Sequence, residues 1–415
     1  MVDVKRLMLL VGIVPSLWAC AEPSGETPAS TSVEIVFDVE RPAGGTFIAW
    51  QDGDGPWTQL PVLAGSFSVA IEPLEKRYAV AYGCATERTP VAGVEANVLY
   101  YYRTVAEAGR LVLEHGCRDA GSARIEGNVS SSSSATNMYA MAGSSGRTIR
   151  KGETKFELGV TPGKTDVFVW FDAFLEDVVV KRDVAVHEGV NAVSLDPNAS
   201  VTMSRDNQML SATGKTTATS RWLTENGTYF VVSDNSAQPA VFNIPQRRAG
   251  DKFNGVLSVS EGGSSRSVQY SASEARTMWL TALPGPLTGV IRKSMSAASG
   301  APLWAAEWNA VAADVMFVNA VQYAYQTNPE LRPDIRNTSI SISGAYVNSS
   351  SMPMSSFAAP DLTMVPGWRT VFDFDTTNTI TVWVAASMGP VIKNGEFTKM
   401  VDGSERITTS LMVAQ

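Results

Sequence analysis

The chain has 415 residues and a formal net charge of −8, and 44% of its residues are hydrophobic while only 18% are charged. The mild acidity excludes a nucleic-acid-binding protein, because such binding needs a basic face. The length predicts about two to four domains. The low charged fraction, with plentiful Ser, Thr, Gly and Asn, favours an extracellular β-rich protein over a charged cytosolic helical one.

The first 19 residues have the features of an export signal. Lys5 and Arg6 precede an apolar stretch at 7–17, and the small Ala19 precedes Cys20. A helix of about 11 apolar residues would span only ~17 Å, which is too short for a bilayer core of ~30 Å. We therefore predict that residues 1–19 are a cleaved signal peptide rather than a transmembrane helix.

The end of this segment carries a family resemblance. Leu17-Trp18-Ala19-Cys20 resembles the lipobox of bacterial lipoproteins, although Trp18 stands where a small residue is usual. The resemblance implies that Cys20 carries a thioether-linked diacylglycerol and an acylated amino group, and that Ala21 favours the outer membrane where a cell has two membranes. Residues 20–32 would form a flexible tether. An ordinary signal peptide with an incidental cysteine is the alternative.

Residues 33–120 predict an antiparallel β-sandwich, because alternating apolar runs are separated by Gly, Pro, Asn and Asp. Cys84 and Cys117 each end such a run, and they form an even pair once Cys20 is lipidated. We predict a disulfide between them, closing a loop of about 34 residues and contributing ~3–4 kcal/mol. Zinc bound by both cysteines and His115 is the alternative, but their spacing fits no compact zinc motif.

Residues 122–196 predict a second sandwich. Ile125-Glu126-Gly127-Asn128-Val129 is followed by the strand 156–160, the turn Pro162-Gly163 and an alternating strand at 166–171. This order resembles the carboxypeptidase regulatory-like, prealbumin-like sandwich, in which the Pro-Gly turn joins two core strands. The resemblance implies a non-catalytic accessory domain. A short similarity between residues 102–106 and 181–185 is a hint of a repeat and no more.

Residues 197–415 keep the strand character and predict one large sandwich or two smaller ones, divided at 284–286. Helix is expected only near 328–336, and residues 349–368 predict a long loop over the sheet. The expected strands are 229–233, 255–260, 276–283, 289–293, 315–325, 339–347, 379–386 and 406–413.

No sequence motif carries catalytic or metal chemistry. The chain has two histidines and no G-x-S-x-G element. The turn at 52–55 begins like a calcium loop, but Pro56 and Trp57 stand where a ligand and a glycine are needed. We therefore predict no catalytic residue, no metal site and no cofactor. The 41 acidic residues leave an envelope hydrolase that uses two carboxylates as an alternative.

Tryptophans provide another kind of candidate site, because exposed aromatic faces stack on sugar rings. Trp57 and Trp368 are the predicted ligand-binding residues, and Trp368 follows Pro366-Gly367 in the long loop. Three further tryptophans were weighed for the same role: Trp222, Trp304 and Trp308. Tryptophans within alternating strands are expected in the core instead: Trp50, Trp170, Trp279 and Trp383.

Together these features predict an all-β surface lipoprotein built of tandem antiparallel sandwiches, Ig-like or prealbumin-like. We expect a non-catalytic structural, adhesive or binding module of the cell envelope. Its expected partners are the membrane, through the lipid on Cys20, and an envelope protein or a glycan. A carbohydrate-binding protein and an envelope hydrolase are the alternative functions.

Overall fold

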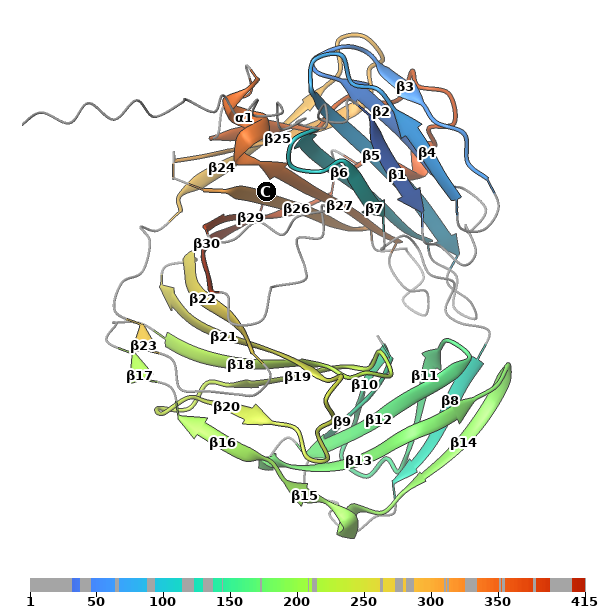
Figure 1. Ribbon diagram of the computed structural model, residues 1–415, viewed down its shortest axis with the longest axis vertical. Coiled ribbons are helices and arrows are strands. Elements are labelled where there is room, and N and C mark those ends of the chain that lie inside the picture. The colour runs from blue at the N-terminus through green and yellow to red at the C-terminus, as the bar shows by residue number, and fades with distance from the viewer. Residues whose placement is uncertain are drawn as a thin grey trace, which may run out of the picture. The chain divides into compact units, whose positions relative to one another are not determined.

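A computed structural model shows that the chain is all-β, as predicted, with one short α-helix and two 3-10 turns among the described residues (Figure 1). In this part of the chain, no helix has both the length and the apolar character needed to cross a membrane. The structure describes residues 32–37, 46–63, 67–87, 94–113, 123–129, 137–143, 145–171, 174–207, 209–210, 215–261, 264–272, 279–280, 287–309, 311, 313–324, 334–350, 352, 355–375, 378–388 and 405–414.

The first seven strands form two facing layers. One layer has the order β4-β1-β7 and the other begins β3-β2-β5-β6, and their shared core includes Ile35, Leu111, Ile48 and Val80. The strands are β1 (Val33–Phe37), β2 (Phe47–Asp52), β3 (Trp57–Gln59), β4 (Phe67–Ile71), β5 (Arg77–Glu87), β6 (Val94–Thr104) and β7 (Arg110–Leu113).

The next seven strands repeat this arrangement. Their layers have the orders β11-β8-β14 and β10-β9-β12-β13, the latter extended by β15 (Val201–Thr202), and β8 runs parallel to β14 as β1 does to β7. The strands are β8 (Ala123–Val129), β9 (Met138–Ala142), β10 (Ser145–Ile149), β11 (Lys155–Val160), β12 (Gly163–Phe171), β13 (Phe174–Val186) and β14 (Gly189–Leu195). Two similar stretches, 102–106 and 181–185, lie at equivalent places in the two units.

Two features of the predicted second sandwich have a structural reason. Gly127 pairs across the ladder with Phe156, whose ring occupies the space that a side chain at residue 127 would need. Gly163 has φ +131° at the turn between β11 and β12, a conformation that favours glycine. The Pro-Gly turn joins β11 to β12, two strands that belong to different layers.

The remaining strands complete a sheet of twelve. Its order is β19-β18-β21-β22-β30-β29-β26-β27-β6-β5-β2-β3. The elements are β16 (Ser204–Asn207), β17 (Met209–Leu210), β18 (Lys215–Leu223), β19 (Tyr229–Asp234), β20 (Ala240–Asn243), β21 (Lys252–Glu261), β22 (Ser264–Ala272), β23 (Trp279–Leu280), β24 (Gly289–Met295), β25 (Pro302–Trp308), β26 (Val315–Ala324), β27 (Asp334–Ser343), β28 (Ser356–Ala358), β29 (Ile380–Met388), β30 (Glu405–Ala414), α1 (Gly344–Asn348), η1 (Pro197–Ala199) and η2 (Thr370–Phe372).

A parallel pairing of β27 with β6 joins the two ends of the chain. Residues 335–342 pair with residues 95–102. Strands of the predicted first domain (33–120) and of the C-terminal region (197–415) therefore belong to one sheet. The proposed divisions near residues 120 and 196 stay a prediction.

The two faces of the twelve-stranded sheet are covered differently. On one face, two clusters pack on the sheet: the first includes Trp304, Tyr346 and Phe357, and the second includes Trp222 and Phe242. On the other face, the layer β4-β1-β7 covers β2 and β5. Between β6 and β19 most described side chains of that second face are half-exposed or exposed, but Val315, Ser341, Ala385 and Ser387 on it are buried.

The sequence missed several strands and misplaced the helix. The strands β3, β9, β10, β15, β16, β17, β18, β20, β22, β25 and β28 were not predicted, and β28 lies within the expected loop at 349–368. The helix α1 takes the end of the expected strand 339–347, where the side chain of Ser343 caps it by accepting a hydrogen bond from the backbone N–H of Tyr346. Residues 334–336 of the expected helical turn lie in β27, and 328–333 lie outside the described residues.

Candidate functional site

The second part of the long loop predicted at 349–368 belongs to a segment that lies on the face of the large sheet covered by the cluster of Trp304, Tyr346 and Phe357. We call residues 356–375 the cover segment. Its start, β28, pairs with β25, and its end is held by Gln322 of β26. The Gln322 side chain donates to the carbonyl of Asp375 (2.6 Å) and accepts from its N–H (2.8 Å), as a neighbouring strand would. The segment is therefore fixed at both ends.

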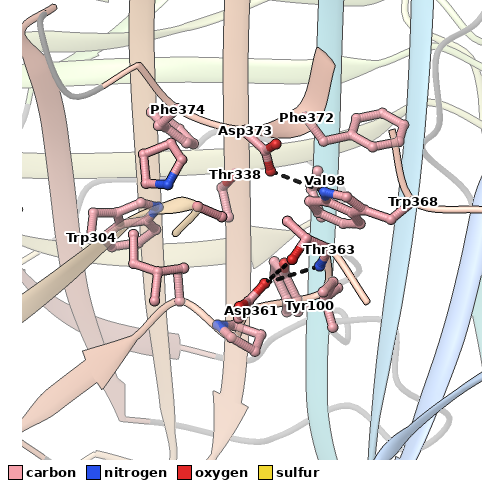
Figure 2. A pocket seen from close by; sticks show the side chains of 16 residues that line it. Val98, Tyr100, Trp304, Thr338, Asp361, Thr363, Trp368, Phe372, Asp373 and Phe374 are labelled. Atoms are coloured by element: carbon pink, nitrogen blue, oxygen red, sulfur yellow. Dashed lines mark hydrogen bonds between the residues drawn. The ribbon is translucent and has the colours of Figure 1, made fainter. Parts of the chain in front are cut away.

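A small hollow lies beneath the cover segment, as Figure 2 shows. Its volume is ≈ 30 Å³, room for about two water molecules. In that view Trp304 and Trp368 stand on opposite sides of the hollow, with Thr338 of β27 between them. The lining comes from β6, β25, β27 and the cover segment: Val98, Tyr100, Ala301, Pro302, Leu303, Trp304, Thr338, Ala359, Pro360, Asp361, Leu362, Thr363, Trp368, Phe372, Asp373 and Phe374.

Trp368 is half-buried at the rim of this hollow. Its ring meets Phe47 edge-on at 5.2 Å between centroids and lies 5.2 Å from Phe372. Its indole Nε1–H donates to Oδ1 of Asp373 at 2.9 Å. Gly367, with φ +84°, lets the chain approach Gln59 of β3 closely. Trp368 is thus a fixed wall rather than a free-standing aromatic platform.

Asp373 is the polar group at one end of the hollow. Its Oδ1 accepts the Trp368 hydrogen bond, and among the described residues its Oδ2 accepts none. Burial raises the pKa of this carboxyl above the ordinary value, against the opposing effects of the Trp368 hydrogen bond and of Arg336. Asp373 therefore presents a weakly solvated acceptor between aromatic walls.

Asp361, at the other end, has a structural role. Its Oδ2 accepts from the hydroxyls of Ser296 and Ser299, both at 2.5 Å. Its Oδ1 accepts from the N–H (3.0 Å) and the hydroxyl (2.6 Å) of Thr363. Burial raises its pKa, but these hydrogen bonds outweigh burial and lower the pKa to about 2. The carboxylate ties the cover segment to the turn between β24 and β25.

Trp57, the other predicted ligand-binding residue, packs on the same hydrophobic cluster as Trp368. Its ring meets Tyr100 edge-on at 6.1 Å between centroids, and Tyr100 lines the hollow. Trp57 does not line the hollow itself. It supports Tyr100 from β3, so only one of the two predicted tryptophans is in the wall.

The burial of the other tryptophans differs from the prediction at Trp383. Trp222, Trp304 and Trp308 are buried. Trp383, which we expected in the core, is 39% exposed, so that prediction was wrong. Its neighbours Val382 and Val384 take the core side of β29 instead.

The cysteine predictions fall partly outside the described residues. Cys84 is fully buried within β5. Cys117, Cys20, the signal peptide at 1–19 and all of the tether except Ser32 lie outside the described residues. The Cys84–Cys117 disulfide and the lipid on Cys20 stay predictions.

The sequence missed both aspartates of the hollow. Asp361-Leu362-Thr363 after Pro360 has a turn pattern, because an aspartate side chain caps the N–H two residues on. Nothing in the sequence distinguishes Asp373 from Asp375. Within the described residues no group of three or more His, Cys, Asp or Glu side chains is placed to hold a metal ion.

Comparisons with known proteins identify no family. No protein-family model and no curated protein matches this sequence. Among solved structures, one similarity is to a protein of Bacteroides uniformis whose carbohydrate binding is itself a proposal. The identity is 6%, the match covers 71% of this chain and 100% of that chain, and the TM-score is 0.15. A TM-score this low supports no conclusion about fold or function.

Proposed function

We propose that this protein is a non-catalytic binding module of the cell envelope and that the hollow beneath the cover segment takes the edge of a sugar residue. The observation that carries the proposal is the Trp368–Asp373 pair. The indole N–H fixes one carboxylate oxygen at 2.9 Å, and Asp373 lies in the wall of a hollow whose lining also includes the rings of Trp304, Trp368 and Phe374. A ligand with both hydroxyl donors and apolar C–H faces matches that chemistry.

The size of the hollow limits what enters it. A volume of ≈ 30 Å³ admits a hydroxyl or hydroxymethyl group rather than a whole ring. The rest of the sugar would lie across the rim formed by Trp368. Binding would therefore be weak for a single sugar and selective for the position of one hydroxyl.

The two aspartates do not favour a hydrolase. A carboxylate pair needs one member as acid and the other as base or nucleophile. Both oxygens of Asp361 already accept two hydrogen bonds each, from Ser296, Ser299 and Thr363. Asp361 is therefore occupied in holding the cover segment, and Asp373 has no second carboxylate ready for catalysis.

The proposed placement is a membrane surface. The lipobox-like Leu17–Cys20 sequence supports a lipid on Cys20, with residues 20–32 as tether and the outer membrane as the site where a cell has two membranes. Palmitate labelling of the wild type but not of Cys20→Ala is expected, and equal labelling of both would end this part of the proposal.

The strand order supports the resemblance of residues 122–196 to the prealbumin-like sandwich. The strands form two layers, β11-β8-β14 and β10-β9-β12-β13, and the Pro162-Gly163 turn joins β11 to β12, whereas the resemblance implies a sandwich in which this turn joins two core strands. The same order in β1–β7 extends that proposal to residues 33–113. Both units would then be accessory sandwiches, and Cys84 and Cys117 would staple the first.

A glycan array probed with the full chain in detergent tests the binding function. We expect saturable retention on at least one saccharide, weakened tenfold or more by Trp368→Ala and by the conservative Asp373→Asn. Tyr229→Ala is the matched control, because Tyr229 is a 40% exposed aromatic on β19. Retention by none of the saccharides, or unchanged retention by both pocket variants, would contradict the proposal.

A further inference from the structure

The face of the large sheet opposite the hollow carries a second set of side chains suited to binding a ligand. Because side chains alternate along a strand, Trp383 points away from the core that Val382 and Val384 occupy. Trp383 pairs with Asn319 of β26 on one side and with Met412 of β30 on the other. We call the following residues the open-face patch: Phe317, Asn319, Val321, Tyr323, Asn337, Ser339, Thr381, Trp383 and Met412.

Hydrogen-bonded amides run across the strands beside the tryptophan. Asn319 Nδ2 donates to Oδ1 of Asn337 (2.8 Å) and to the hydroxyl of Ser339 (2.8 Å). Asn337 Nδ2 in turn donates to Oδ1 of Asn97 (3.1 Å). Among the described residues, Oδ1 of Asn319 accepts no hydrogen bond. The ladder therefore fixes an amide acceptor next to the indole of Trp383.

Two exposed aromatic rings mark the ends of a track. Trp383 is 39% exposed and Tyr323 is 47% exposed. Tyr323 lies four residues along β26 from the partner of Trp383, which places the two about 14 Å apart at ~3.4 Å per residue and ~4.8 Å between strands. The pair Val321 and Thr381 lies between them. The spacing suits an extended ligand rather than a single ring.

Charge decides the class of ligand. None of the nine residues of the open-face patch carries a charge, although the whole chain has a net charge of −8. An anionic or cationic partner would find no complementary group there. The patch shares its aromatic residues and Met412 with protein interfaces, but it has no Arg, and its amides and hydroxyls lie beside the rings, whereas the buried centre of a protein interface is more apolar. A ligand made of uncharged rings that carry hydroxyl groups matches both the lack of charge in the patch and its mixture of amides and aromatic rings.

We propose that the open-face patch binds a neutral polysaccharide chain, which runs from Trp383 toward Tyr323 with its hydroxyls on the amides of the ladder. This site lies on the opposite face of the sheet from the Trp368 hollow and does not depend on it. The chain would stack on both aromatic rings, and Asn319 would accept from a hydroxyl beside Trp383. One molecule could then hold a polymer and a sugar edge on two faces.

Native gels containing hydroxyethylcellulose, xyloglucan, galactomannan or dextran test this site, with polygalacturonate as the charged polymer. The full chain in detergent should be retarded by at least one neutral polymer. Trp383→Ala should weaken that retardation tenfold or more, and Tyr323→Ala should weaken it less. Tyr229→Ala should behave as wild type, and Trp383→Ala should weaken retardation by the same factor in a Trp368→Ala background, which separates this site from the hollow. Thermal unfolding checks that each variant is folded.

Three results would overturn the proposal. They are no retardation by any of the four neutral polymers, equal retardation of wild type and Trp383→Ala, and retardation by polygalacturonate alone. Sedimentation velocity tests the competing possibility, that the open-face patch binds a second copy of the chain. A concentration-dependent dimer that Trp383→Ala abolishes would assign the patch to self-association instead.

Discussion

Arg103 and Arg182 occupy equivalent places in the two seven-stranded units, each on the sixth strand and each buried. Their charges are met differently. Arg182 donates to Asp166 and Asp251, both at 2.8 Å. The guanidinium of Arg103 donates to the carbonyl and hydroxyl of Ser341, and burial lowers its pKa to about 10. In the first unit the arginine thus joins β6 to β27, and in the second it joins the sandwich to the turn before β21.

Replacing Arg182 should be strongly destabilising. Arg182→Met leaves Asp166 and Asp251, whose side chains are both 0% exposed, without their counter-charge. Removing one partner of a buried ion pair costs about 3–5 kcal/mol. Urea unfolding measures the loss. Arg248→Ala is the matched control, because Arg248 pairs with Asp183 and Glu225 at the surface, where losing an ion pair costs much less stability. Equal losses would show that burial of the pair is not what matters.

The stability of the cover segment should depend on pH through Asp361. Its folded pKa of about 2 lies below the ordinary 3.8. The stabilisation is therefore present above pH 3.8 and is lost as the pH falls toward 2, where the folded carboxylate also takes up its proton. The difference in melting temperature between wild type and Asp361→Asn should shrink across this window. A constant difference from pH 5 to pH 2 would refute the assignment.

Trp368 should tune the carboxyl of Asp373. Trp368→Phe keeps a ring in the wall but removes the indole N–H, which favours the charged carboxylate. The pKa of Asp373, already raised by burial, should then rise further. Titration of the carboxyl ¹³C resonance measures this shift, with Trp57→Phe as control, since Trp57 only supports Tyr100. An unchanged titration in Trp368→Phe would mean that the hydrogen bond does not act on Asp373.

The predicted disulfide is open to a direct test. Non-reducing peptide mapping should find Cys84 linked to Cys117. Cys84→Ser should lower the free energy of unfolding by ~3–4 kcal/mol, the chain-entropy value for a loop of about 34 residues. A free thiol at Cys84 would contradict the disulfide, and a link between Cys84 and Cys20 would contradict both the disulfide and the lipid on Cys20.

Alternation along strands predicted the fold class but not which face is covered. Trp383 and Val384 are both apolar neighbours on β29, so the sequence alone gives no reason to expose one of them. The strands β18 and β22 were missed because Ser, Thr and other polar residues interrupt the alternation of large apolar residues in each. The hollow could not be predicted, because it depends on the pairing of β6 with β27, whose residues are about 240 positions apart.

The prealbumin-like pattern in residues 122–196 predicted more structural detail than the alternation of apolar residues did, because it depends on residues within one short stretch of the chain. Gly127 opposite Phe156, and the turn at Gly163, are short-range consequences of residue type. By contrast, Asp361 and Asp373 acquire their roles from Ser296, Ser299 and Trp368, contacts that no spacing in the sequence reveals.

The central claim, that the hollow binds a sugar edge at Asp373, is tested most directly by the indole N–H resonance of Trp368. The full chain in detergent is titrated with the methyl glycosides of glucose, galactose, mannose, xylose and N-acetylglucosamine. At least one of them should shift the Trp368 resonance saturably, with the Trp383 resonance unmoved and the effect lost in Asp373→Asn. A Trp368 resonance that stays in place with all five sugars, or that moves equally in Asp373→Asn, would contradict the account.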